Sequence, residues 1–71
     1  MMKLRGFLKN ETDKAILFEI TSDPGGVHLQ GQTEWFPRST IRLPKRLHGE
    51  ISIYVHNWFY DTKVIVNHQN I

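Results

Sequence analysis

The chain has 71 residues, a formal net charge of +2 and no cysteine. This length allows one small domain, in which folding buries only about 60% of the surface that the unfolded chain exposes. The lack of cysteine excludes a disulfide framework, a thiolate nucleophile and thiolate metal sites. Because no apolar run is long enough for a signal peptide or a membrane span, the sequence predicts a cytoplasmic protein without membrane association, in a bacterium or an infected host cell.

The chain is predicted to open with a β-hairpin. Residues 3–8 read as a short strand, in which Gly6 marks a bulge or a close approach of another backbone segment. A polar turn over 9–13 leads into a strand over 14–20. The alternation of apolar residues predicts that one face of this second strand holds Ile16, Phe18 and Ile20.

A turn is predicted at Ser22-Asp23-Pro24-Gly25-Gly26, because proline and glycine suit the second and third positions of a type II turn. A phosphate-binding glycine loop is disfavoured, since neither a helix nor a lysine follows. Residues 27–36 are predicted to form one long strand or two short ones, with Gly31 as a bulge or a second turn. Pro37 then forces the chain to bend or to leave the sheet.

The second half alternates in the same way. Residues 40–43 predict a short strand with Arg42 outward, and a loop turning at Gly49 leads to the clearest strand, residues 51–55. Residues 57–62 fit either a short helix capped by Asn57 or an extension of that strand. Residues 63–66 are predicted to close the sheet, and 67–71 to form a polar tail.

These elements predict a mainly β fold with a single small antiparallel sheet. At five or six short strands, the sheet is expected to curl into an SH3-like or OB-like barrel or half-barrel, with room for one short C-terminal helix. No linker divides the chain.

Two segments carry a resemblance. Residues 11–19 read Glu-Thr-Asp-Lys-Ala-Ile-Leu-Phe-Glu, and residues 34–41 read Glu-Trp-Phe-Pro-Arg-Ser-Thr-Ile. They resemble a "T-E-K-A-x-L" strand and a "W-[LIF]-P-[KR]-S-x-I" segment of small, poorly characterised proteins of phages, plasmids and their bacterial hosts. The resemblance covers about a third of the chain and implies a mobile-element context.

Charge is concentrated in one segment. Arg38, Arg42, Lys45 and Arg46 place four positive charges within nine residues that hold no acid, whereas the rest of the chain has five basic and seven acidic residues. Such a segment either protects a sheet edge against aggregation or binds phosphate. Tyr54 is predicted to face away from the core, whereas the small core favours burial of Trp35 and Trp58.

The predicted function is non-enzymatic. The four histidines are scattered, no acids are spaced for acid–base catalysis, and neither a metal nor another cofactor is expected. Binding of nucleic acid, preferably single-stranded, is the first hypothesis, since basic grooves and exposed aromatic side chains serve that purpose. The predicted binding residues are Arg38, Arg42, Lys45, Arg46, Tyr54 and Trp58.

A protein-interaction module is the alternative. It could be a phage-encoded inhibitor of a host defence complex, or a self-associating structural protein such as a homodimer, because bare sheet edges invite strand addition. Salt separates these hypotheses, since only phosphate binding weakens steeply as salt rises.

Overall fold

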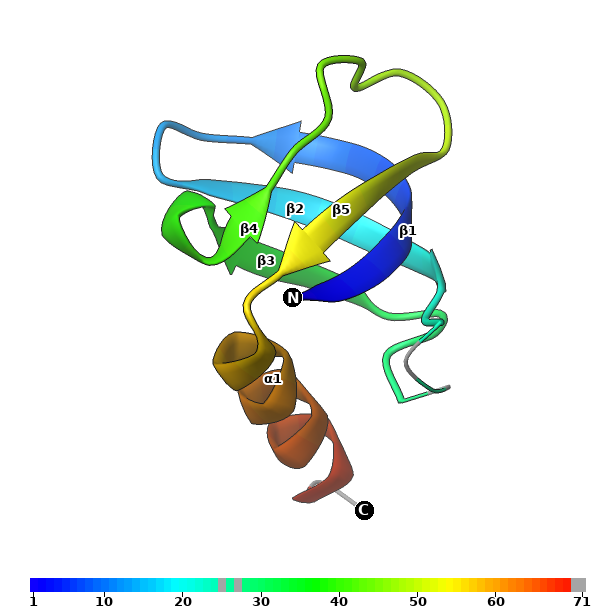
Figure 1. Cartoon of the computed structure of the whole chain (residues 1–71), viewed down its shortest axis with the longest axis vertical. Coiled ribbons are helices and arrows are strands. Elements are labelled where there is room, and N and C mark those ends of the chain that lie inside the picture. The colour runs from blue at the N-terminus through cyan, green and yellow to red at the C-terminus, as the bar shows by residue number, and fades with distance from the viewer. Residues whose placement is uncertain (25, 27, 70–71) are drawn as a thin grey trace.

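Five antiparallel strands form one sheet in a computed structural model of the chain, which describes residues 1–24, 26 and 28–69, with side chains described up to residue 65 (Figure 1). The order across the sheet is β3-β2-β1-β5-β4. The strands are β1 (Met2–Glu11), β2 (Ala15–Ser22), β3 (Thr33–Pro37), β4 (Ile41–Arg42) and β5 (Ile51–Val55). The predictions of a mainly β fold and of a single antiparallel sheet are therefore confirmed.

The predicted hairpin is present as β1 and β2, with β1 longer than expected at both ends. In the turn, the Thr12 hydroxyl oxygen accepts hydrogen bonds from the backbone N–H groups of Lys14 (3.4 Å) and Ala15 (3.1 Å). The register of β1 against β2 shifts between Arg5 and Gly6, and a Cβ added at Gly6 would lie 1.8 Å from the Glu19 carbonyl oxygen. The close backbone approach proposed for this glycine is confirmed, whereas the register shift beside it leaves the extra residue, Thr21, in β2.

The segment between β2 and β3 differs from its prediction. The Gly26 N–H donates to the Asp23 carbonyl (3.0 Å), so the predicted turn exists, although Gly25 lies outside the described residues. Strand β3 begins only at Thr33. Of the one or two strands predicted over 27–36, the described residues 28–32 form none, and Leu29 is buried in the core. The alternative of a second turn at Gly31 is confirmed, since its φ is +85° and the Gln32 N–H donates to the Leu29 carbonyl (3.0 Å).

The second half of the sheet follows its predicted pattern. After Pro37 the chain leaves β3 through a single 3₁₀ turn, η1 (Arg38–Thr40), before β4. Gly49, at φ +72°, turns the loop between β4 and β5 as expected. The inward positions of both strands are buried, and these are Ile41, Ile51, Ile53 and Val55.

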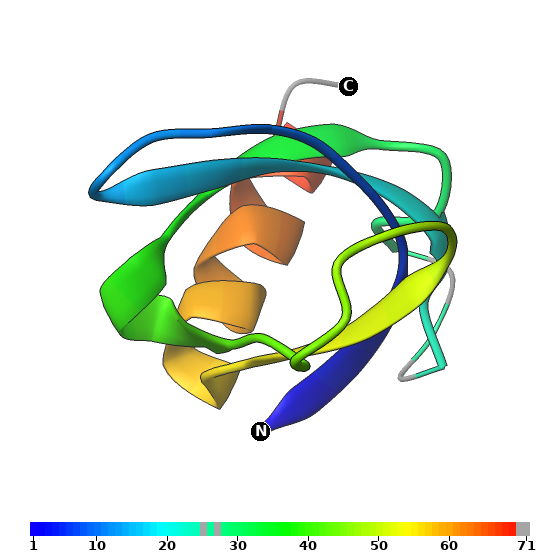
Figure 2. The same cartoon turned by 90° about the horizontal axis from the view of Figure 1, so that it is seen from above.

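The sheet is curled but open. Figure 2 shows the strands curving round in a curl, yet no pairing joins the edge strands β3 and β4 within the described chain. A closed barrel, SH3-like or OB-like, is therefore not confirmed. The helix α1 (Asn57–Gln69) lies at one open end of the curl, below the sheet in Figure 1 and within its outline in Figure 2.

Residues 57–62 are helical, so of the two alternatives the helix is confirmed. The strand predicted over 63–66 is wrong, because α1 continues through these residues. Phe59, Tyr60 and Val64 face the core, and the Phe59 ring lies 5.9 Å from that of Phe36. The spacing of these side chains suits a helix, and their burial outweighs the strand preference of the β-branched run at 64–66. The polar tail is also helical as far as Gln69, whereas residues 70 and 71 lie outside the described chain.

A buried polar pair ties the helix to the loop after β2. The Tyr60 hydroxyl donates to Asp23 Oδ2 (2.6 Å), which also accepts from the Leu29 N–H (3.3 Å). Burial, followed by the hydrogen bond to Asp23 and its negative charge, raises the pKa of Tyr60. The pair thus fixes the position of the helix relative to the sheet.

Candidate nucleic-acid interface

Three side chains form a row across the outer face of the sheet. In the strand register, Tyr54 of β5 lies directly between Arg42 of β4 and Lys3 of β1. All three are exposed, since the inward positions of these strands are occupied by the core. Directly opposite Cβ atoms lie about 4.5–5.5 Å apart, so an aromatic ring stands between two cations. This set is called the Lys3–Tyr54–Arg42 row below.

A second aromatic group continues the line of β5. The His56 N–H donates to the Thr40 carbonyl (2.8 Å), which extends the pairing beyond Val55 and keeps His56 on the face of Tyr54. The Trp58 ring stacks on His56, with centroids 6.4 Å apart and an interplanar angle of 19°. Trp58 is 63% exposed. This set is called the His56–Trp58 stack.

Both tryptophans are exposed, which overturns the preference for burial and agrees with the inclusion of Trp58 among the predicted binding residues. Trp35 is 44% exposed, because it shares the outer face of β3 with Thr33 while Phe36 fills the inner position. Trp58 lies in the first turn of α1, whose core-facing positions are taken by Phe59 and Tyr60. Smaller side chains fill the core, so neither indole packs into it. Tyr54 is exposed as predicted.

Lys45 and Arg46 are exposed in the loop between β4 and β5, which rises above the sheet in Figure 1. Glu50 anchors the end of this loop by accepting hydrogen bonds from Arg5 Nη2 (2.9 Å) and the Thr21 hydroxyl (2.8 Å). The Arg5 hydrogen bond, and after it the Thr21 one, lowers the pKa of Glu50 below its usual value. The loop therefore carries its two cations along the chain between Arg42 of β4 and the anchored start of β5.

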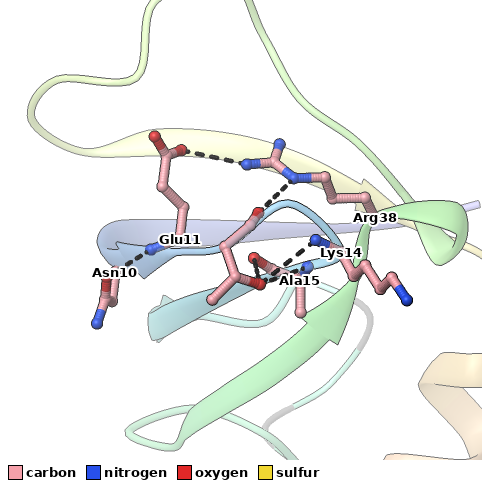
Figure 3. A network of polar contacts seen from close by, with 6 residues as sticks. Asn10, Glu11, Lys14, Ala15 and Arg38 are labelled. Carbon is pink, nitrogen blue, oxygen red and sulfur yellow. Dashed lines mark hydrogen bonds and ion pairs between the residues drawn. The ribbon is translucent and has the colours of Figure 1, made fainter.

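Arg38 does not join this group. Figure 3 shows its guanidinium reaching the β1–β2 turn, where Nε donates to the Thr12 carbonyl (3.0 Å) and Nη2 lies 3.4 Å from Glu11 Oε2. Its backbone N–H also donates to the Lys14 carbonyl (2.8 Å). The structure thus gives this arginine a role in joining η1 to the hairpin.

Ion pairing sharpens the charge distribution. The three basic residues Arg5, Arg38 and Lys63 pair with Glu50, Glu11 and Glu34. Within the described chain the other six basic side chains form no ion pair, and these are Lys3, Lys9, Lys14, Arg42, Lys45 and Arg46. Lys3 was not among the predicted site residues. The available signal was that both Lys3 and Tyr54 were predicted to point outward from their strands.

Other chemistry is not apparent in the described part of the chain. It encloses no pocket, brings no three His, Asp or Glu side chains together as metal ligands, and has no helix long and apolar enough to cross a membrane. Comparison with known proteins finds no family model, no curated protein and no solved structure that matches this chain.

Proposed function

We propose that this protein is a non-enzymatic, cytoplasmic nucleic-acid-binding protein of a phage or mobile element. The observation that carries the proposal is the Lys3–Tyr54–Arg42 row, in which an exposed aromatic side chain lies between two cations. Lys45 and Arg46 add two charges on the adjoining loop. Unpaired Lys and Arg side chains on one face attract phosphates and release their counterions, which supplies most of the affinity of non-specific binding.

The fold suits this role. A curled antiparallel sheet exposes one face along several strands while its inner face holds the core. We infer that the curl is an SH3-like half-barrel, because the 3₁₀ turn η1 carries the chain from the edge strand β3 to the opposite edge strand β4. An experimental structure in which the sheet is flat would contradict this assignment.

Charge reversal tests the proposed function. The Arg42→Glu/Lys45→Glu double variant should retain the fold, because both side chains are exposed, and should lose binding to nucleic acid at low salt. The matched control is Lys9→Glu/Lys14→Glu, which changes the net charge equally at exposed positions of the β1–β2 hairpin. Equal loss in both variants would show that only the overall charge matters and would overturn the assignment of the site.

The second candidate is a protein-interaction module, either self-associating or directed at a host defence complex. It is favoured by the free edge of β3. The Gln32 carbonyl accepts from the Ile20 N–H, and the Arg38 N–H donates to the Lys14 carbonyl. In an antiparallel ladder every second residue bonds to the partner strand, so the backbone groups of Thr33 and Trp35 point away from the sheet. A bare edge of this kind accepts an added strand.

An apolar strip on the outer face accompanies that edge. Trp35 lies opposite Leu17, and Phe7, which is 37% exposed, lies opposite the next outward residue of β2, Glu19. Trp35→Lys should therefore lower the sedimentation-derived mass at high protein concentration if the protein self-associates, whereas Tyr54→Lys should leave it unchanged. A monomer at all concentrations would remove self-association from consideration.

A further inference from the structure

Two exposed aromatic groups lie on and directly after β5. Tyr54 and His56 are two residues apart on an extended backbone, so their side chains leave the same face about 6.6–6.8 Å apart. Trp58 stacks on His56 and, at 63%, is the most exposed large apolar side chain among those described. Two aromatic surfaces therefore follow one another along the chain, Tyr54 on β5 and the His56–Trp58 stack directly after it.

Cations flank this line rather than interrupting it. Lys3 and Arg42 lie on the strands to either side of Tyr54. Arg5, which follows Lys3 on the same face of β1, is paired with Glu50 and adds no net charge. One carboxylate opposes the arrangement, since Asp61 is exposed one helical turn after Trp58.

We propose that a single strand of nucleic acid lies along β5, with one base on Tyr54, another on the His56–Trp58 stack, and its phosphates beside Lys3 and Arg42. This deepens the proposed function and rests on it, since it names the ligand as a strand with unpaired bases. A duplex keeps its bases stacked inside and offers none to these surfaces. Stacking of bases on aromatic side chains tolerates any sequence, because every base has a π-face.

The test compares two oligonucleotides of equal length, one normal and one abasic, in fluorescence titrations at low salt. Tyr54→Ala and Trp58→Ala should each weaken binding of the normal strand by about 5- to 150-fold and leave binding of the abasic strand unchanged. Lys3→Gln should weaken both, since it acts on phosphate. Asp61→Asn should tighten both, because it removes the opposing charge.

A second readout guards against loss of fold in the alanine variants. Trp35→Phe leaves Trp58 as the sole tryptophan, and Trp58→Phe leaves Trp35. Binding of the normal strand should quench fluorescence in the first variant and leave the second nearly unchanged.

The possible failures are distinguishable. If the abasic and normal strands bind equally, and neither aromatic variant changes the affinity, the base-stacking path is wrong while phosphate binding stands. If neither strand binds to the native protein, the proposed function itself fails and the path fails with it.

Discussion

At the scale of single residues, the tightest constraint lies at Gly6. Its backbone φ is not positive, yet a Cβ there would lie 1.8 Å from the Glu19 carbonyl oxygen, which belongs to the neighbouring strand and has no room to move. At Gly31 the situation is reversed, because φ is +85° and no atom lies within 4 Å of the added Cβ. The two glycines thus serve different physical needs.

Substitution separates these needs. Gly31→Ala should cost about 1–2 kcal/mol, the strain of a left-handed backbone. Gly6→Ala should cost more, because overpacking alone costs about 1–3 kcal/mol and here the strands themselves must part. Urea denaturation measures both values. A Gly6→Ala variant as stable as the native protein would contradict the bulge described between β1 and β2.

The Asp23–Tyr60 hydrogen bond is a second residue-scale feature. Tyr60→Phe should lower the free energy of unfolding by about 1.5–3 kcal/mol, since it removes a buried hydrogen bond to a carboxylate. Tyr54→Phe is the matched control, because Tyr54 is exposed, and should change stability by less than about 0.5 kcal/mol. Equal effects of the two variants would contradict the role assigned to the pair.

The same hydrogen bond predicts a dependence on pH. The pKa of Tyr60 is raised above its ordinary value of 10.0, so above that pH the unfolded chain releases the phenolic proton while the folded protein keeps it. The contribution is therefore complete below pH 10.0 and declines as pH rises further. The stability difference between the native protein and Tyr60→Phe should be smaller at about pH 11 than at about pH 8.

At the scale of elements, helix α1 completes the core, although its Trp58 side chain is exposed. Phe59, Tyr60 and Val64 close the open end of the curled sheet against Phe36. A chain ending at His56 should lose this cover and give poorly dispersed amide NMR signals. A chain ending at Ile65 keeps these contacts and should retain native dispersion. Native spectra for the shorter chain would show that the sheet folds without the helix.

The loop anchor at Glu50 is a second test at this scale. Its carboxylate pKa should lie below the ordinary 4.5 in NMR titrations, because Arg5 and Thr21 donate to the charged form. The anchor is complete above that value and is lost as pH falls through the lowered pKa. Arg5→Gln should move the pKa back toward 4.5. An unchanged pKa in that variant would contradict the contact.

Elements also show what could be predicted from the sequence. Strands β1, β2 and β5 followed from alternation, since one face of each meets the core. The helix was half missed because Val64, Ile65 and Val66 favour strands locally. The spacing of Phe59, Tyr60 and Val64 was the better signal, since it places their side chains on one helical face. Loop residue Leu29 was taken for part of a strand because burial alone does not specify backbone conformation.

At the scale of the whole molecule, the site was predictable in part. Parity placed Tyr54 and Arg42 outward, but only the strand order brings Lys3 beside them. Of the four charges clustered in the sequence, three are left without an ion pair, because Arg38 turns back to Glu11 and Thr12. The exposure of Trp35 and Trp58 depended on which side of each element the core occupies, and that is set by the assembled sheet.

Of the basic side chains outside the ion pairs of the described chain, Lys9 and Lys14 belong to the β1–β2 hairpin, and the other four lie on or beside β4, β5 and the loop between them. Four cations there, Lys3, Arg42, Lys45 and Arg46, set the expected strength of phosphate binding. For single-stranded nucleic acid the logarithm of the affinity falls with the logarithm of salt concentration by roughly 0.7 per neutralised phosphate. Four contacts thus predict a slope of about −3.

The most direct test of the central claim is this slope, measured for the native protein with single-stranded DNA by fluorescence anisotropy at several salt concentrations. We expect saturable binding at low salt with a slope near −3, reduced to about −1.5 in Arg42→Glu/Lys45→Glu where residual binding is measurable. Absence of saturable binding at low salt, or an affinity that does not change with salt, would contradict it.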